Sequence, residues 1–447
     1  MYGVGAFGYG SIGQTTSSFL MFFGTGVLGI PGTLMGIAIG ISTVWDATTD
    51  PIVGHLSDNT KSRRFGKRHG WILFAGIAVA VANLLLWSIP SGLGINAKFW
   101  LLFIMLLLME TFNTCYSTPY SALGLDLSRS YDDRTAVQNF RAAFSFSSLL
   151  VPSLLMLVFL RDPSLPGGYM GIAWVTSTLC ILCAVICFIG TRRALSSDDF
   201  LESPKPSDSA RAKKGGLSSI FGEFFGVMKQ KNVALLIFGY AVSLSAGAFI
   251  TSLGLHVFTY TFGFSTTQIP IIMVSLIVGI VGGQPFWYRF SKRTDKKTAL
   301  LTALGLLCVC MVVFSALLAF REVIPIGALM FYICSTIFLS GVGSGCLYSI
   351  PISMYADCVD KRRTETGIDN AGKSAGFLTF CTKISNALIL FIIGLSLDII
   401  GFNGANATQP YNVQNWLGIV LVTGVVTASV IAMLIYSRYD FKKEDFN

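Results

Sequence analysis

The sequence predicts an all-α membrane protein with twelve transmembrane helices in two groups of six. Of its 447 residues, 53% are hydrophobic and only 12% are charged, and the mean hydropathy is +0.66. An average soluble domain has about 25% charged residues, so the composition excludes an ordinary water-soluble protein. Twelve apolar runs divide the chain, each of about 20 residues, the length that crosses a bilayer.

Each run has the composition of a membrane helix, and the segments between the runs are polar. The runs of the first half are residues 5–27, 31–53, 70–90, 98–122, 141–161 and 169–190. The runs of the second half are residues 233–258, 266–290, 298–320, 324–350, 373–399 and 414–436. The first run follows Met1 without a basic segment or a cleavage site, so we expect a retained helix rather than a signal peptide.

The longest polar stretch separates the two halves. We predict an N-terminal six-helix bundle at 1–190, a cytoplasmic central loop at 191–232, and a C-terminal six-helix bundle with a short tail at 233–447. A basic loop follows both the second and the eighth run. Repeated halves of this kind are typical of secondary transporters.

The basic residues predict how the chain crosses the membrane. With twelve spans, both termini and the basic loops lie on one side, which holds nearly all of the 32 Lys and Arg residues. Only Lys98, Arg161 and Arg321 lie in loops on the other side. Because basic loops stay in the cytoplasm, we expect cytoplasmic termini in a plasma membrane or bacterial inner membrane.

Several other classes of function lack their usual signals. The ten Cys lie mostly inside apolar runs, which predicts free thiols rather than a disulfide framework. With three His and no HExxH motif, a zinc site is not expected. The sequence has neither a Walker A loop nor a nucleic-acid motif. We therefore expect no enzyme activity, no cofactor and no nucleic-acid partner.

Two carboxylates in the second run are the main candidates for a cation site. Asp46 and Asp50 are four residues apart, so they share one face of a helix. Two negative charges this close need a cation or a proton, and Thr49 adds a neutral oxygen. The pattern predicts a site for Na+ or H+ and does not decide between them.

Three more ionisable residues in the spans are candidates for function, because charge is expensive there and usually functional. Lys383, near the middle of the eleventh run, is too deep to reach either surface and needs a carboxylate or a solute as its partner. Glu110, in the fourth run, is a candidate for an ion pair or a solute contact. Arg141 begins the fifth run and can hold a carboxylate, a phosphate or sugar hydroxyls.

Charged residues that follow the second and tenth runs are candidates for a gate. Such clusters can hold one conformation of a transporter, or they can simply set its topology. The gate candidates are Asp58, Arg63, Arg64, Arg68, Asp357 and Asp360.

These residues resemble the glycoside–pentoside–hexuronide:cation symporter family, a branch of the major facilitator superfamily. The segment Trp45-Asp-Ala-Thr-Thr-Asp-Pro51 carries the resemblance, together with the basic stretch 63–68. The segments Pro119-Tyr-Ser-Ala-Leu123 and 356–360 fit the same family. The resemblance covers the whole chain and implies two six-helix bundles that work by alternating access.

The resemblance also implies roles for single residues. It places the family's cation-site carboxylates on Asp46 and Asp50, neutral ligands on Thr49 and Thr114, and the coupling lysine on Lys383. The family's sugar-binding positions fall on Gly10, Ser117, Ser121 and Tyr348. The first two of these stand where the family has aspartates, which argues against a galactoside.

We therefore predict a secondary active transporter that couples Na+ or H+ to the symport of a sugar or glycoside-like solute. The solute would lie near Tyr348, Ser117, Ser121, Arg141 and Glu110. One alternative is a sodium-dependent lysophospholipid-type carrier, because the segment 109–123 is similar to that of lysophosphatidylcholine carriers. A second alternative is an uncoupled exchanger or sensor with the same fold. We expect a monomer in a lipid bilayer.

Overall fold

The computed structural model describes the chain except residues 61, 63–64, 66, 128–130, 164, 193–230, 367–370, 405, 407 and 441–447. The described part is helical, without a β-strand, and forms two compact units. Unit 1 is Met1–Ala212 with Asn403–Ala407, and unit 2 is Lys213–Phe402 with Thr408–Asn447. Because the predicted central loop lies almost wholly within 193–230, the predicted domain boundaries stay predictions.

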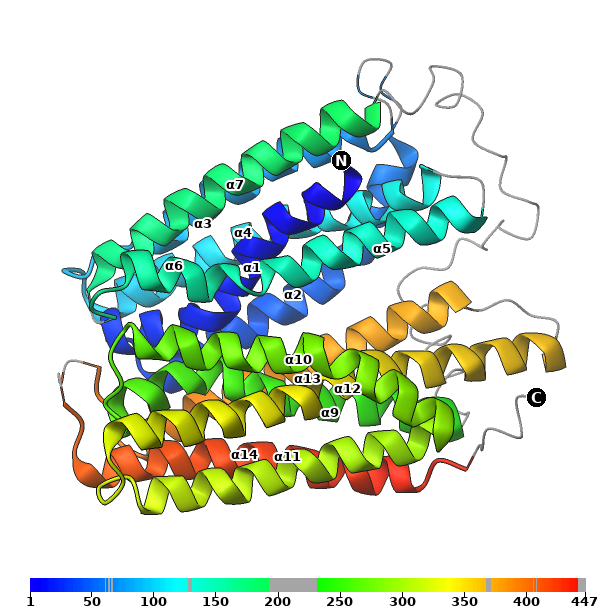
Figure 1. Cartoon of the computed structure of the whole chain (residues 1–447). Coiled ribbons are helices and arrows are strands. Elements are labelled where there is room, and N and C mark those ends of the chain that lie inside the picture. The colour runs from blue at the N-terminus through cyan, green and yellow to red at the C-terminus, as the bar shows by residue number, and fades with distance from the viewer. Residues whose placement is uncertain are drawn as a thin grey trace. The chain divides into compact units, whose positions relative to one another are not determined.

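Unit 1 contains the first six predicted spans. Its helices are α1 (Tyr2–Phe22), the π-helix η1 (Phe23–Val27), α2 (Gly32–Asn59), α3 (His69–Trp87), α4 (Ile95–Asp126), α5 (Tyr131–Ser148), α6 (Val151–Phe159) and α7 (Pro166–Arg192) (Figure 1). α5 and α6 share the fifth span, which is broken between them. α1 packs on α5 and α7, α3 packs on α4 and α7, and α2 packs on α4.

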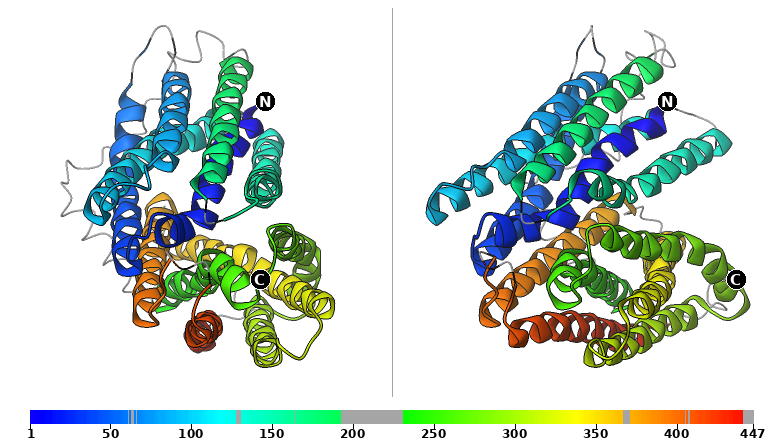
Figure 2. Two further views of the ribbon diagram at one scale, coloured as in Figure 1. Left: turned by 90° about the vertical axis from the view of Figure 1, so that its left-hand side faces the viewer. Right: turned by 60° about the vertical axis from the view of Figure 1, so that its left-hand side comes forward.

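Unit 2 repeats this arrangement. Its helices are α9 (Lys231–His256), the π-helix η3 (Val257–Thr261), α10 (Gln268–Arg293), α11 (Lys296–Ala319), α12 (Ile326–Thr366), α13 (Ala371–Ile399) and α14 (Tyr411–Ser437) (Figure 2). α9 packs on α13 and α14, α11 packs on α12 and α14, and α10 packs on α12. Each pairing in unit 1 therefore has its counterpart in unit 2.

The first helix of each unit ends in the same turn. A π-helix widens its last turn, so that the Leu28 amide donates to the carbonyl five residues back at 2.9 Å. The Phe262 amide makes the same bond in unit 2 at 3.2 Å. Each turn includes a glycine with positive φ, 68° at Gly29 and 65° at Gly263, a conformation that side chains disfavour.

Ten helical segments of the described part are long and apolar enough to cross a membrane, judged by length and composition. They correspond to the third to twelfth predicted spans, with α5 and α6 counted together. α1 and α2 occupy the first two predicted spans and are less apolar. α1 is rich in Gly, Ser and Thr, and α2 carries Asp46 and Asp50. The two most polar spans therefore lie in the unit that holds the predicted cation ligands.

Three helices extend at least six residues beyond the apolar runs that predicted them, and one of them, α5, begins at Tyr131 instead of near residue 141. α2 continues to Asn59 instead of ending near residue 53, and α12 continues to Thr366 instead of ending near residue 350. A helix that leaves the bilayer no longer needs apolar side chains, so hydropathy falls before the helix ends. The predicted boundaries mark the apolar segment rather than the helix.

Candidate functional site

The interface between α2 and α4 brings the predicted cation ligands together. α2 carries Asp46, Thr49 and Asp50 on one face, because these positions are three or four residues apart. α4 lies beside it and presents Thr114. Thr114 is fully buried and Thr49 is nearly so, whereas both carboxylates are half-buried. The cluster is therefore partly shielded from solvent.

Hydrogen bonds hold the geometry around Asp46. The Thr114 hydroxyl donates to Asp46 Oδ1 at 2.5 Å. Thr49 Oγ1 donates to the Asp46 carbonyl oxygen at 3.1 Å and lies 3.4 Å from Thr114 Oγ1. The Asp46 carboxylate, the Asp46 carbonyl and the hydroxyls of Thr49 and Thr114 thus lie close together at the α2–α4 interface. Every atom of this group that could bind a cation is an oxygen.

Asp50 has a partner on α4 that the sequence analysis missed. Thr118 Oγ1 donates to Asp50 Oδ1 at 3.3 Å, and Trp45 Nε1 donates to Thr111 Oγ1 at 2.9 Å. Thr111, Thr114 and Thr118 follow an i, i+3, i+7 spacing, which places all three on one helical face. That spacing is a signal visible in the sequence.

A proline lies beside the cluster in each helix. Pro51 directly follows Asp50 in α2, and Pro119 directly follows Thr118 in α4. A proline has no N–H to donate to the carbonyl four residues earlier, which in α2 is that of Ala47. Each helix therefore has one backbone carbonyl that lacks its usual intrahelical hydrogen bond, within about one turn of the site. Such a carbonyl oxygen can serve as a neutral ligand.

The donor set suits a small hard cation or a proton. Carboxylate, hydroxyl and carbonyl oxygens are ligands of hard cations, whereas zinc and copper prefer nitrogen and sulfur. Across the described residues, no three His, Cys, Asp or Glu side chains gather as a metal centre. Two carboxylates one turn apart repel each other, so a positive charge bound between them relieves that repulsion.

Two residues predicted to contact the solute, Arg141 and Ser121, touch each other. Arg141 Nη2 donates to the Ser121 hydroxyl at 3.2 Å, and Nη1 donates to Gln138 at 3.4 Å. The guanidinium also lies 5.7 Å from the centre of the Tyr120 ring. All three of these described partners are neutral, and a guanidinium can bind a phosphate, a carboxylate or a hydroxyl-rich solute.

The other solute candidates of unit 1 lie on α1 and α4. Glu110 is half-buried one helical turn before Thr114, and Ser117 is half-buried on the same helix. Gly10 packs against α5, where an added Cβ would lie 2.8 Å from Ser148 Oγ. The small size of Gly10 therefore also serves helix packing, and its role in binding solute stays a prediction.

Lys383 and Tyr348 lie in unit 2. Lys383 is half-buried on α13. Two residues later, Ser385 donates to the Ala241 carbonyl of α9 at 3.2 Å and lies 3.1 Å from Ser245 Oγ. Tyr348 is 43% exposed on α12. Coupling by Lys383 and solute contact by Tyr348 stay predictions.

Ion pairs occur at both predicted gate segments. Asp58 pairs with Arg68 at 3.2 Å and with Lys67 at 3.7 Å. Asp357 pairs at 2.5 Å with Lys296 at the start of α11, a partner that the sequence analysis did not predict. Their action as gates stays a prediction. The gate candidates Arg63 and Arg64, and the side chain of Asp360, lie outside the described part of the chain.

The repeated six-helix units and the α2–α4 cluster agree with what sequence comparison finds. The chain matches the family described as MFS/sugar transport protein over residues 1–443. The chain belongs to this family. It is therefore a multi-pass membrane transport protein of the major facilitator superfamily and not an enzyme. The match confirms the relationship that segment 45–51 predicted.

Curated relatives of this MFS transport protein are similar over almost its whole length. Sodium-dependent lysophosphatidylcholine symporter 1 of Xenopus tropicalis is 24% identical, covering 99% of this chain and 87% of the relative. A protein of Synechocystis sp. described as an uncharacterized symporter is 26% identical, covering 92% of this chain and 87% of the relative.

Solved structures show the same fold at lower identity. The D-xylose-proton symporter aligns with 99% of this MFS transport protein and 97% of its own chain, at a TM-score of 0.69 and 11% identity. The nucleoside transporter NupG aligns with 98% of this chain and 98% of its own, at a TM-score of 0.62 and 14% identity. Both alignments concern the fold alone.

Proposed function

We propose that this protein is a symporter that couples Na+ to the movement of an organic solute. The observation that carries the proposal is the Asp46 carboxylate, held by the buried Thr114 hydroxyl at 2.5 Å with Thr49 beside it. Charge inside a membrane protein is expensive to move, and a bound cation neutralises it. Symport follows if the binding site switches readily from one side of the membrane to the other only when both the cation and the solute are bound.

We favour Na+ over H+ as the coupling ion. A proton needs only one carboxylate oxygen, whereas Na+ needs several oxygen ligands, and the cluster offers hydroxyls and carbonyls beside Asp46 and Asp50. Relatives that cover 99% of the chain carry the name sodium-dependent symporter. We further propose cytoplasmic termini in a plasma membrane, no cofactor, and Lys383 as the coupling residue.

A sugar or glycoside is the first candidate for the solute. The family is described as a sugar transport family. The adjacent Arg141 and Ser121 offer a guanidinium and a hydroxyl, which suit sugar hydroxyls.

A lysophospholipid is the second candidate. Several relatives are named lysophosphatidylcholine symporters. Gly10 and Ser117 also stand where carboxylates would hold a sugar, so strong acceptors for sugar hydroxyls are missing at those two positions. Arg141 suits a phosphate as well as a sugar.

The cation site is tested by the melting temperature of the purified protein in NaCl and in choline chloride, each at two pH values. A ligand of the folded state stabilises by about 2.7 kcal/mol at roughly a hundred times its Kd. We expect Na+ to stabilise the wild type but not Asp46→Asn. The matched control is Asp162→Asn, an exposed carboxylate between α6 and α7, which should respond like the wild type.

The outcomes separate the hypotheses. An equal response to Na+ in Asp46→Asn would refute the site, and a response to pH but not to Na+ would replace Na+ by H+. Glycosides, sugar acids and lysolipids, added under the same conditions, identify the solute by further stabilisation that depends on Na+. Solute exchange in proteoliposomes that is equally fast without any coupling cation would favour an uncoupled exchanger.

A further inference from the structure

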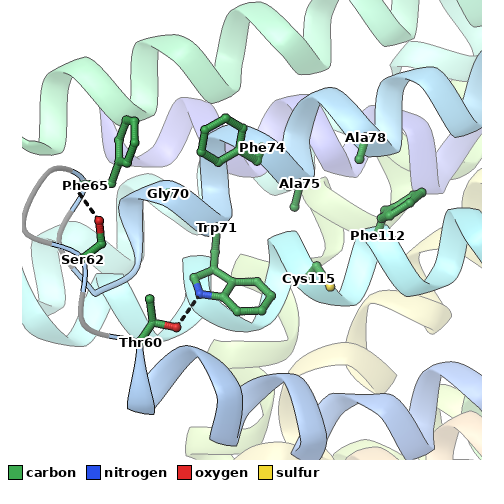
Figure 3. A pocket seen from close by; sticks show the side chains of 10 residues that line it. All are labelled: Thr60, Ser62, Phe65, Gly70, Trp71, Phe74, Ala75, Ala78, Phe112 and Cys115. Atoms are coloured by element: carbon green, nitrogen blue, oxygen red, sulfur yellow. Dashed lines mark hydrogen bonds between the residues drawn. The ribbon is translucent and has the colours of Figure 1, made fainter.

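The residues of the proposed cation site, Asp46, Thr49, Asp50, Thr114 and Thr118, are called the cation cluster. A pocket on unit 1 lies outside this cluster and has no part in the proposed transport. It has a volume of about 420 Å³ and lies among the end of α2, the start of α3 and the middle of α4 (Figure 3). This volume is within the roughly 300–1,000 Å³ range of small-molecule sites. Four aromatic rings line it, those of Phe65, Trp71, Phe74 and Phe112.

The polar atoms around this pocket have partners within the protein. Trp71 Nε1 donates to Thr60 Oγ1 at 2.9 Å, and the Thr60 hydroxyl donates to the Leu56 carbonyl at 2.8 Å. Ser62 Oγ accepts the Phe65 amide at 3.2 Å. An apolar occupant can therefore fill the pocket without stripping water from an unsatisfied polar group. The chemistry of the lining fits a hydrocarbon.

The shape of the pocket fits a chain rather than a compact molecule. Figure 3 shows Ser62 and Phe65 at the end near the α2–α3 loop, with Ala78 and Phe112 at the opposite end. From Gly70 to Ala78, α3 rises about 12 Å at ~1.5 Å per residue. Phe74 remains 58% exposed, so the pocket opens on the surface of the unit. An open slot parallel to a membrane helix has the direction of a lipid chain.

The loop at the mouth is basic. The segment 61–68 contains five Lys and Arg residues in the sequence. Of these, Lys67 and Arg68 both pair with the Asp58 carboxylate, at 3.7 Å and 3.2 Å. The positive excess predicts that this end faces the cytoplasm, where anionic lipid headgroups attract such segments.

We propose that this pocket binds one acyl chain of an anionic bilayer phospholipid, with its headgroup at Lys67 and Arg68, which precede α3. The lipid is a resident of the protein rather than its transported solute, so the proposal does not rest on the proposed function. Phe112 and Cys115 line the pocket from the turns of α4 that carry Thr111 and Thr114 on the α2 side. The lipid chain therefore packs against the same turns of α4 that carry Thr111 and Thr114.

The first test measures how fast N-ethylmaleimide alkylates Cys115 in the full-length protein in detergent, followed by mass spectrometry of the peptide. Phosphatidylglycerol should slow this reaction about tenfold at roughly ten times its Kd, because only the unoccupied fraction reacts. Cys381, half-buried in unit 2, is the internal control and should keep its rate. An unchanged Cys115 rate would overturn the proposal, and this readout needs no variant.

The second test fills the pocket. Ala78→Phe places a ring in the slot, whereas Val81→Phe adds the same ring to α3 at a 48% exposed position outside the lining. We expect phosphatidylglycerol to raise the melting temperature of the wild type and of Val81→Phe, and to lose this effect in Ala78→Phe. Equal stabilisation of all three proteins would overturn the proposed place of the lipid.

The third test concerns the headgroup. Phosphatidylcholine with the same acyl chains should protect Cys115 less than phosphatidylglycerol at equal concentration. The difference should shrink in high salt, because the attraction to the basic loop is screened. Equal protection by both lipids would overturn the requirement for an anionic headgroup.

Discussion

The α2–α4 interface of unit 1 and the α10–α12 interface of unit 2 hold the same place in the two repeated folds, but they are built differently. In unit 1 the two helices meet through polar side chains. Thr114 bonds to Asp46, and Thr118 bonds to Asp50. Hydroxyl and carboxylate oxygens therefore lie between these two helices.

In unit 2 the corresponding helices meet through glycines. An added Cβ on Gly345 would lie 2.7 Å from the Ile280 carbonyl oxygen, and one on Gly283 would lie 3.1 Å from Val342 Cα. On Gly279 it would collide with the Phe338 carbonyl oxygen. Here backbone packs directly on backbone, as small residues allow in membrane helices.

The difference teaches which interface can hold an ion. The α2–α4 interface offers oxygen ligands, whereas in the α10–α12 interface backbone atoms lie where such side chains would stand. We therefore expect the cation to bind in unit 1 and the glycine contacts of α10 and α12 to serve helix packing in unit 2. The three predictions below test this division, from the largest expected effect to the smallest.

The largest effect is expected from Gly279→Leu. The new side chain meets the Phe338 carbonyl, which is backbone and cannot rotate away. We expect the free energy of unfolding to fall by about 3 kcal/mol, at the upper end of the range for overpacking. The loss should be seen as a lower melting temperature and a less monodisperse protein. Gly282→Leu on the same helix has open space and should change little. Similar losses in both variants would contradict the glycine interface.

A smaller effect is expected in the polar interface. Thr114→Val removes the hydroxyl that contacts Asp46 but keeps the shape of the side chain. Because this hydroxyl orients Asp46 and offers its own oxygen to the cation, the Na+ concentration for half-maximal stabilisation should rise roughly tenfold, which corresponds to about 1.4 kcal/mol of binding free energy. Thr114→Ser should preserve most of the affinity.

Thr111→Val is the matched control for this prediction. Its hydroxyl accepts a bond from the Trp45 indole instead of facing a carboxylate. It should leave the affinity for Na+ nearly unchanged. If both Val variants weakened binding to the same extent, general packing of α4 rather than ligation at Thr114 would be the cause.

The smallest effects are expected at the two ion pairs near the helix ends. Asp357→Asn breaks a partly exposed pair with Lys296, and such pairs contribute about 0–1 kcal/mol. Asp58→Asn should lower the melting temperature still less, because Asp58 is 56% exposed. Both effects should vanish near ~1 M NaCl, where charges are screened within about 3 Å. An Asp357→Asn effect that persists there would show that the contact is not mainly electrostatic.

Much of the cation cluster was predictable, and the reasons differ from residue to residue. Asp46 and Asp50 are charges in an apolar run, which single them out without any structure. Thr114 was predicted from the family resemblance, because a single Thr in an apolar helix does not by itself indicate a binding site. Thr111 and Thr118 were missed although they share its helical face. Hydroxyls inside membrane helices are common, and their spacing gains meaning only once the facing helix is known.

The glycine interface of unit 2 was not predictable from the sequence. The chain has 46 glycines, and nothing in their order tells which of them face another helix. The partner of Asp357 was missed for a similar reason, since Lys296 is distant in sequence and one of many basic residues in the loops. Hydropathy identifies spans, whereas contacts between spans depend on rotation of each helix about its axis.

The π-helical turn at the end of the first helix in each unit bears on the ancestry of the chain. The two halves differ in their carboxylates, in their glycine contacts and in most side chains. They nevertheless keep the same widened turn and the same left-handed glycine at residues 29 and 263. The two units therefore share this backbone geometry where their carboxylates and glycine contacts differ. Alignments of the two halves should therefore be anchored on this turn rather than on sequence identity.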